Sequence, residues 1–236
     1  AAMMLPGMAL AQVGDARFVV SKNFTDDNPT SIEVTITCNT GIPLTQSASI
    51  TEDSGVGFVV TSFDPILGTC EITEDGEAGY TGTYLANDSL PSDTSCLFED
   101  NFAEGDQFCI INNAPTPVPV AVSKVWNMEG AGGNEVETDS TFYITSMGSI
   151  SGGYPCIDGP IGDNGYNCAM LHFYGEDTQS VSVTPAVGGT DVYIEEMNLD
   201  SAVEVSNDCD GMVTVAPADA GASCTYTNTV FFEGIP

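Results

Sequence analysis

Positive charge is the property that this sequence most lacks. The 236-residue chain has 3 Lys plus Arg against 34 Asp plus Glu, which gives a formal net charge of −31. Because nucleic-acid phosphates and anionic membrane surfaces are bound through Lys and Arg, this balance argues against both as partners. Hydrophobic residues still make up 42% of the chain, which is enough to build packed cores. The positions of the three basic residues, Arg17, Lys22 and Lys124, are therefore informative.

Catalytic and metal-binding motifs are also missing. The sequence contains no G-x-S-x-G, P-loop or H-E-x-x-H pattern. Its single histidine, His172, stands beside apolar and aromatic residues, which is typical of a packed side chain rather than a catalytic one. The acidic turn at 158–165 offers oxygen ligands for calcium, although a solvated turn is the simpler interpretation. We therefore predict no catalytic site for an external substrate, no metal site and no cofactor.

The cysteines indicate the compartment. No C-x-x-C pair occurs, so the close ligand pairs of a thiolate zinc site are missing. An even number of cysteines favours disulfides, which persist in oxidising spaces. The sequence therefore predicts a secreted, cell-surface or extracellular protein. The eight cysteines are Cys38, Cys70, Cys96, Cys109, Cys156, Cys168, Cys209 and Cys224.

No apolar run is long enough to cross a membrane, which takes about 20 residues. Residues 1–11 read AAMMLPGMALA and resemble the end of a signal peptide, with a Pro-Gly break before A-L-A. No other segment comes closer to a membrane span. We expect residues 1–16 to be either such a signal-like segment or a retained donor strand that docks on a neighbouring subunit.

The two halves of the chain repeat the same short motifs. The pattern V-S-K-x-F/W occurs at 20–24 and at 122–126, and a Gly-Thr pair precedes a glutamate with the same spacing at 68–74 and 189–195. A strand that ends in Asn closes each copy, at 108–112 and 224–228. Three motifs in one order indicate a duplicated domain of about 100 residues. Between the copies, the proline-rich segment 114–120 favours an extended linker.

Apolar and polar residues alternate over short runs, as at residues 32–38, and this period of two predicts strands. Clusters of Gly, Asp, Asn and Ser interrupt the runs about every 8–12 residues, as in sandwiches. No segment has a sustained helical period. The sequence therefore predicts an all-β fold with two tandem sandwiches, at 17–113 and 121–230, followed by a tail at 231–236.

Each copy resembles the prealbumin-like or Cna-B-type immunoglobulin-like (Ig-like) domain of bacterial surface proteins. That family opens on V-x-K-x-W/F, has G-x-Y-x-V-x-E in the middle and closes on F-x-I-x-N. The copies depart from this pattern at Cys70 and Asp191, which replace the Tyr, and at Cys224, which replaces the closing Phe. The matching residues are Val20, Lys22, Phe24, Gly68, Ile72, Glu74, Phe108, Ile110 and Asn112 in the first copy, and Val122, Lys124, Trp126, Gly189, Tyr193, Glu195, Tyr226 and Asn228 in the second.

The resemblance implies one intramolecular isopeptide bond per domain, between the lysine and the asparagine, with the glutamate assisting. A lysine amine attacks a carboxamide only when it is neutral, so it must lie in an apolar pocket that lowers its pKa. A nearby carboxyl that holds a proton would polarise the carboxamide, and adjacent first and last strands would hold the groups together. No enzyme activity beyond this self-reaction is expected. The implied residues are Lys22, Glu74 and Asn112 in the first domain and Lys124, Glu195 and Asn228 in the second.

A plainer interpretation of these residues stays open. Lys22 and Lys124 would then be surface residues inherited through the duplication, with Glu74 and Glu195 as ordinary ion-pair partners. In the second copy Glu196 is adjacent to Glu195 and faces the other way on a strand.

The cysteines fit the plan of the resembled domain, although four cysteines per domain allow three pairings. One cysteine precedes each closing strand and one lies within it, which favours homologous pairs in the two copies. The last pair would tie off an insertion at about 148–176. The expected disulfides are Cys96–Cys109, Cys209–Cys224, Cys38–Cys70 and Cys156–Cys168.

The final residues, Ile235 and Pro236, are similar to the start of an exosortase-type (Ile-Pro-Thr-Leu) processing tail. The leading hypothesis is a non-enzymatic extracellular structural protein, a subunit of a bacterial surface filament, pilus or matrix polymer. It would assemble with copies of itself, with the N-terminal segment as a candidate contact. The alternative is an adhesin or stalk that binds a ligand through the insertion of the second domain.

Overall fold

The computed structural model describes residues 14–87, 89–99, 105–129, 139–156, 165–197 and 203–231. These residues form strands and turns without any helix, so the all-β prediction is confirmed. The described part of the chain accordingly holds no helix with the length and apolarity that a membrane crossing requires. The chain divides into two compact units, residues 1–114 and 115–236, which we call unit 1 and unit 2.

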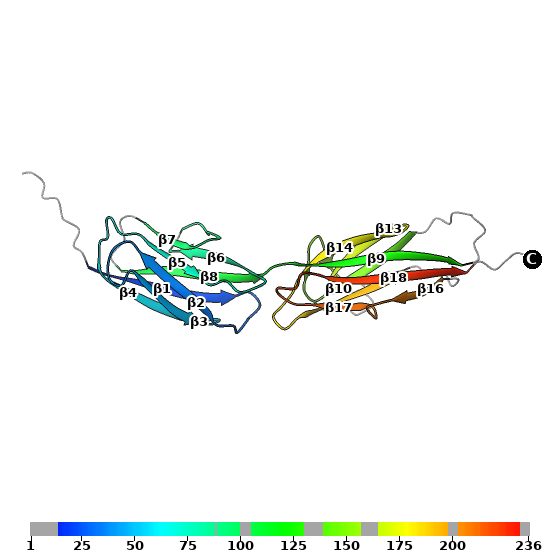
Figure 1. Ribbon diagram of the computed structural model, residues 1–236, viewed down its shortest axis with the longest axis horizontal. Helices are drawn as coiled ribbons and strands as arrows, with labels where there is room; N and C mark the ends of the chain where they lie inside the picture. The colour runs from blue at the N-terminus through cyan, green and yellow to red at the C-terminus, as the bar shows by residue number, and fades with distance from the viewer. Residues whose placement is uncertain are drawn as a thin grey trace, which may run out of the picture. The chain divides into compact units, whose positions relative to one another are not determined.

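Unit 1 is a sandwich of two four-stranded sheets, with strand orders β4-β1-β8-β6 and β3-β2-β5-β7 (Figure 1). Alternate residues of each strand face the core, as for Phe18 and Val20 on β1 and Val34 and Ile36 on β2, all at most 1% exposed. The strands are β1 (Gly14–Phe24), β2 (Ile32–Cys38), β3 (Thr45–Ile50), β4 (Gly55–Phe63), β5 (Cys70–Glu74), β6 (Tyr80–Ala86), β7 (Cys96–Phe98) and β8 (Asp106–Pro115).

Unit 2 repeats this arrangement, with strand orders β11-β14-β9-β18-β16 and β12-β13-β10-β15-β17. Apart from the short strands β11 and β12, each sheet has a counterpart of the same order in unit 1, as a duplicated domain requires. The strands are β9 (Val118–Glu129), β10 (Asp139–Ser146), β11 (Ser149–Ile150), β12 (Tyr154–Pro155), β13 (Asn167–Tyr174), β14 (Asp177–Thr184), β15 (Thr190–Met197), β16 (Val203–Asn207), β17 (Met212–Val215) and β18 (Ala222–Phe231).

The first and last strands of each unit lie side by side and run parallel. In unit 1 the register places Phe24 of β1 opposite Asn113 of β8. In unit 2 it places Trp126 of β9 opposite Asn228 of β18. Residues far apart in the sequence are therefore brought to the same place in each sandwich, next to the conserved lysine two positions earlier.

Three predicted boundaries need correction. The linker predicted at 114–120 shrinks to two residues, because β8 continues to Pro115 and β9 begins at Val118, whose side chain enters the core. The insertion predicted at 148–176 includes the core strand β13, which pairs with β10 along its whole length. Residues 14–16 of the predicted N-terminal segment belong to β1, whereas residues 1–13 and the tail from 232 lie outside the described residues.

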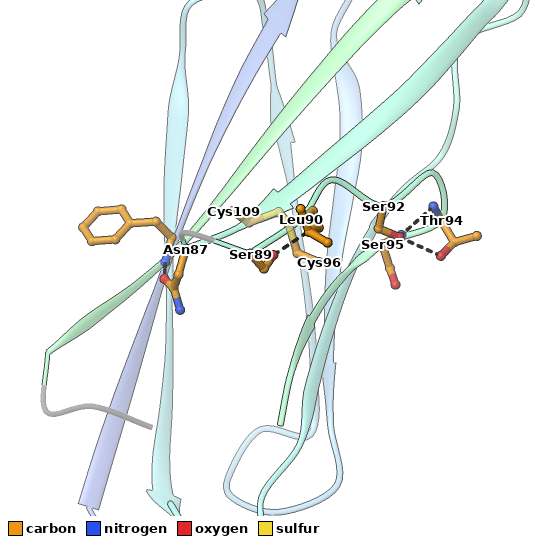
Figure 2. The surroundings of a disulfide bond; sticks show 9 residues. Asn87, Ser89, Leu90, Ser92, Thr94, Ser95, Cys96 and Cys109 are labelled. Atoms are coloured by element: carbon orange, nitrogen blue, oxygen red, sulfur yellow. Dashed lines mark hydrogen bonds between the residues drawn. A yellow bond between two sulfur atoms is a disulfide. The ribbon is translucent and has the colours of Figure 1, made fainter. Parts of the chain in front are cut away.

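Four disulfides join the pairs that the two copies suggested. In unit 1, Cys38–Cys70 links neighbouring strands of one sheet, and Cys96–Cys109 crosses from β7 to β8 in the opposite sheet. Figure 2 shows this second bond beside the turn that contains Ser92 and Thr94. The bonds close separations of 12 to 32 residues, and loop closure of this size stabilises a fold by roughly 3 kcal/mol. The unit 2 pairs are Cys156–Cys168 and Cys209–Cys224.

Candidate functional site: a buried lysine, carboxylate and carboxamide in each unit

Lys22 is buried inside unit 1, with 2% of its surface exposed. It follows Val20 on the inward face of β1, because side chains of a strand alternate between the two faces. Its Nζ lies 2.9 Å from Glu74 Oε2, and the two side chains are 0% and 2% exposed. The ring of Phe24, on the same face of β1, covers the amine with its centroid 4.5 Å from Nζ. A charged side chain is therefore enclosed by a carboxylate and an aromatic ring.

Asn113 supplies the carboxamide in unit 1, and the prediction of Asn112 is wrong. Cys109, Ile111 and Asn113 form the inward face of β8, so the half-buried Asn112 points to the other face. Asn113 is 1% exposed, and its Oδ1 has no hydrogen-bond partner among the described residues. A Cβ built on Gly82 of β6 would lie 3.0 Å from Glu74 Oε1 and 3.2 Å from Asn113 Oδ1. Both oxygens therefore converge on the space left by this glycine.

Unit 2 contains the same three groups in closer contact. Lys124 is 1% exposed, and its Nζ donates hydrogen bonds to Glu196 Oε1 at 2.7 Å and Oε2 at 2.8 Å. Asn228 is fully buried, and its Nδ2 donates to the same Oε1 at 2.9 Å. Its Oδ1, like that of Asn113, has no hydrogen-bond partner within the described ranges. The Trp126 ring lies 4.7 Å from Lys124 Nζ, and the Phe142 ring lies 5.5 Å away.

Glu196, and not the predicted Glu195, is the carboxylate beside Lys124. The inward face of β15 is formed by Val192, Ile194 and Glu196, whereas Glu195 is exposed. The Gly-Thr spacing misled the prediction because the second copy has one more residue between this pair and the glutamate. The register shows this difference, since Val34 pairs with Glu74 and its counterpart Phe142 pairs with Glu196.

Sequence signals for the correct residues were present. In each copy the inward-facing residues follow one pattern, with a cysteine, a large apolar residue and an asparagine at alternate positions of the closing strand. Aligning Cys109 with Cys224 places Asn113 opposite Asn228. The same alternation, from Cys70 to Glu74 and from Val192 to Glu196, identifies the second glutamate.

The environment of the site favours an uncharged amine. Burial lowers the pKa of Lys22 and of Lys124 below the ordinary value of 10.5, and the attraction of Glu74 and Glu196 opposes this shift. Burial also raises the pKa of Tyr84 and of Tyr226 to about 12, and the negative charge of the nearby glutamate adds to the effect. The site thus combines a potential nucleophile, a carboxyl that can carry its proton, and a carboxamide, in a pocket closed to water.

The remaining candidates do not form a second reactive centre in the part of the chain that the structure describes. His172 is exposed and not packed as predicted, because Leu171 and Phe173 take the inward positions of β13; its Nδ1 lies 3.0 Å from Thr141 Oγ1. Most of the acidic turn at 158–165 lies outside the described residues. Asp208 lies close to Cys209 and Cys224, but these two cysteines are joined in a disulfide and offer no thiolate.

Comparisons with known proteins give only distant likenesses. No protein-family model and no curated protein match the sequence. Three solved structures align with most of the chain. They are a major pilin of Streptococcus pyogenes (10% identity over 92% of this chain and 97% of that chain, TM-score 0.35), a B repeat unit of the collagen-binding surface protein of Staphylococcus aureus (12%, 93% and 99%, TM-score 0.31) and the TIE protein of Bacillus anthracis (9%, 92% and 34%, TM-score 0.49). At these scores we base no functional conclusion on them.

Proposed function

We propose that each unit closes an isopeptide bond between its buried lysine and the asparagine of its last strand, Lys22 with Asn113 and Lys124 with Asn228. One observation carries this proposal: in both units a buried lysine contacts a buried glutamate, at 2.9 Å and 2.7 Å, beside a buried asparagine whose Oδ1 is unpaired. Burying an ion pair and an unpaired carbonyl oxygen costs free energy. Conversion of the ammonium and the carboxamide into one neutral amide would remove much of that cost.

The glutamate has a defined part in this reaction. Its carboxylate takes a proton from the lysine ammonium, and the resulting amine attacks Cγ of the asparagine. The new N–C bond forms and the Cγ–Nδ2 bond breaks. The departing nitrogen takes one proton from the attacking amine and leaves as ammonia, and the proton held by the glutamate leaves with it. The contact of Glu196 Oε1 with both Lys124 and Asn228 suits this transfer, because one oxygen touches the nucleophile and the leaving group.

These bonds would give the protein a load-bearing function. Lys22 lies in the first strand of unit 1 and Asn113 lies near the end of the last strand. A pull on the two ends of the unit would then pass through the bond and leave residues 23–112 unstretched. That segment of roughly 90 residues would otherwise lengthen by about 3.3–3.6 Å per residue. Resistance to extension is what a subunit of a surface filament, pilus or matrix polymer needs, and the four disulfides suit an extracellular site.

Assembly of the chain with copies of itself is part of this proposal, with the apolar N-terminal residues as the contact. Deleting residues 1–13 should then abolish self-association measured by light scattering at matched protein concentrations. Equal association of the deleted and full chains would exclude this segment as the contact, and a monomeric full chain would argue against polymer assembly.

Trypsin provides a direct test of the bonds, because the chain offers only Arg17, Lys22 and Lys124 as cleavage sites. A lysine that has become an amide is no longer cut. After reduction and denaturation, the bonded protein should therefore be cut only after Arg17. Its intact mass should be lower than that of the sequence by one ammonia per bond, once the disulfides are accounted for. Complete cleavage after Lys22 and Lys124 would refute the proposal.

A second candidate function, ligand binding by unit 2, is favoured by one observation. A groove of about 500 Å³ lies along β13 and β14, with Tyr154, Met170, His172 and Ser182 in its lining. Aromatic, thioether and hydroxyl groups of this kind suit a sugar or an extended peptide. A glycan or peptide that raises the melting temperature of unit 2, and no longer does so after Tyr154→Ala, would support this function. No shift with any member of a broad library would argue against it.

A further inference from the structure

A second glutamate contacts the strand that carries the lysine, at the same place in both units. In unit 1, the backbone N–H of Phe24 donates to Glu52 Oε2. In unit 2, the backbone N–H of Trp126 donates to Glu176 Oε1 at 2.9 Å. Phe24 and Trp126 each lie two residues after the buried lysine and opposite the buried asparagine. The carboxylate is thus bound at the one backbone position that adjoins all the reacting groups.

The hairpin sequences make this coincidence informative. Glu52 lies in a four-residue turn between β3 and β4, whereas Glu176 lies in a two-residue turn between β13 and β14. In unit 1 the backbone ladder along this edge ends where Lys22 N–H donates to Ser54 O at 3.0 Å, and the carboxylate takes the next acceptor position. In unit 2 the register ends at the pair Asp177 and Lys124. Two turns of different length therefore supply the same acceptor to the same backbone group.

The backbone group that is held carries the ring over the amine. The Phe24 centroid lies 4.5 Å from Lys22 Nζ, and the Trp126 centroid lies 4.7 Å from Lys124 Nζ. We propose that Glu52 and Glu176 are positioning residues that fix these aromatic rings as lids over the lysine amines. The lid keeps water from the amine before the bond forms. This inference rests on the proposed isopeptide reaction for its consequence, but the position of the lid can be measured without any bond.

Hydrogen bonding, and not charge, is the property that the lid requires. A second carboxylate near the lysine favours the ammonium over the neutral amine, which opposes the reaction. Glutamine keeps an acceptor oxygen for the backbone N–H and removes the charge. We therefore expect Glu→Gln at either position to keep the lid closed and the reaction at least as fast, and Glu→Ala to open the lid. A residue that merely stabilised its hairpin through charge would not follow this order.

The lid of unit 2 can be followed directly because Trp126 is the only tryptophan. The background for this measurement is the full chain with Asn228→Ala, in which no bond can form in unit 2. Adding Glu176→Ala should move the emission of Trp126 to longer wavelength and increase its quenching by acrylamide. Adding Glu176→Gln should leave both unchanged. The same emission and quenching in the alanine and glutamine variants would overturn the inference.

The effect on the reaction is tested in the same chain, with one unit as the control for the other. Full-length protein is made by cell-free translation under oxidising conditions, quenched at intervals, denatured and digested with trypsin. Glu52→Ala should slow protection of Lys22 roughly tenfold and leave Lys124 unaffected, since one charge-assisted hydrogen bond is lost, and Glu176→Ala should do the reverse. Glutamine variants should react like the original chain. Unchanged rates in both alanine variants would overturn the inference, whereas an original chain that is never protected would refute the isopeptide proposal and leave the fluorescence test to decide the lid.

Discussion

In unit 2 the amine of Lys124 and the amide of Asn228 contact one oxygen of Glu196, whereas in unit 1 the two oxygens of Glu74 divide these neighbours. Glu74 Oε2 lies beside Lys22, and its Oε1 faces the space at Gly82 that Asn113 Oδ1 also borders. The same three groups are therefore held by the carboxylate alone in unit 2, and by the carboxylate together with a narrow gap in β6 in unit 1. Changes to the glutamate should affect both units, and changes to β6 should affect unit 1.

The disulfides show a similar division between what the units share and what they do not. Cys109 and Cys224 occupy equivalent positions, each four residues before the buried asparagine and on the same face of the closing strand. The pair Cys38–Cys70 has no counterpart, since unit 2 has Ser146 opposite Val192 at that position. The shared features thus gather on the closing strand, which would be anchored by a disulfide at one point and by the lysine at another.

The largest expected effect comes from removing one carboxamide. Asn113→Ala should prevent the bond in unit 1 and thereby release a loop of roughly 90 residues, which is worth about 4–5 kcal/mol by loop closure. For a domain of this size, the melting temperature should fall by roughly 20–30 °C. Calorimetry should show this fall for the unit 1 transition alone, with unit 2 as the internal reference. Asn112→Ala, on the opposite face, is the matched control, and an equal fall for both variants would contradict the assignment.

The next effect separates two adjacent glutamates. Glu196→Gln should slow bond formation in unit 2 at least about 100-fold, because proton transfer by a positioned carboxyl contributes 10²–10⁴ in rate. Glu195→Gln changes an exposed side chain on the same strand and should have no effect. Tryptic cleavage after Lys124 reports the outcome, and cleavage after Lys22 serves as the reference within the same chain. Protection of Lys124 in the Glu196→Gln chain would show that this carboxyl is dispensable.

These paired variants also mark the limit of what the sequence could predict. Alternating apolar residues predicted the strands, the duplication and both lysines, because Val20 and Lys22 belong to one unbroken pattern. The partners of the lysine were each placed one residue off, at Asn112 and Glu195. In a strand, a shift of one residue turns a side chain to the other face. Short motifs matched by spacing carry no information on facing when one copy has an extra residue, and only the register of the paired strands resolves it.

A smaller effect should follow from filling the gap in β6. A Cβ on Gly82 would sit 3.0 Å from Glu74 Oε1 and 3.2 Å from Asn113 Oδ1, so Gly82→Ala must displace both oxygens slightly. Because misplacement of reacting groups by less than 1 Å already reduces rates, bond formation in unit 1 should slow by roughly tenfold. Gly76→Ala, where an added Cβ meets no atom within 4 Å, is the control. The time course of Lys22 protection measures both, and equal rates would mean that the gap is not used.

The smallest effect is a difference in pH dependence between a bonded and an unbonded unit. In the Asn113→Ala chain, Lys22 keeps a free amine whose pKa burial lowers from 10.5 in the folded state. Between the lowered value and 10.5 the unfolded chain binds more protons than the folded one, so the free energy of unfolding should rise with pH in this window. The slope can reach at most about 1.4 kcal/mol per pH unit. The amide of a bonded Lys22 does not titrate, so the original chain should lack this slope. Urea unfolding between pH 7 and 9.5, about the range below tyrosine ionisation, gives the comparison. Other groups titrate alike in both chains and cancel in the difference, so parallel curves would show that Lys22 is free in the original protein or charged in the variant.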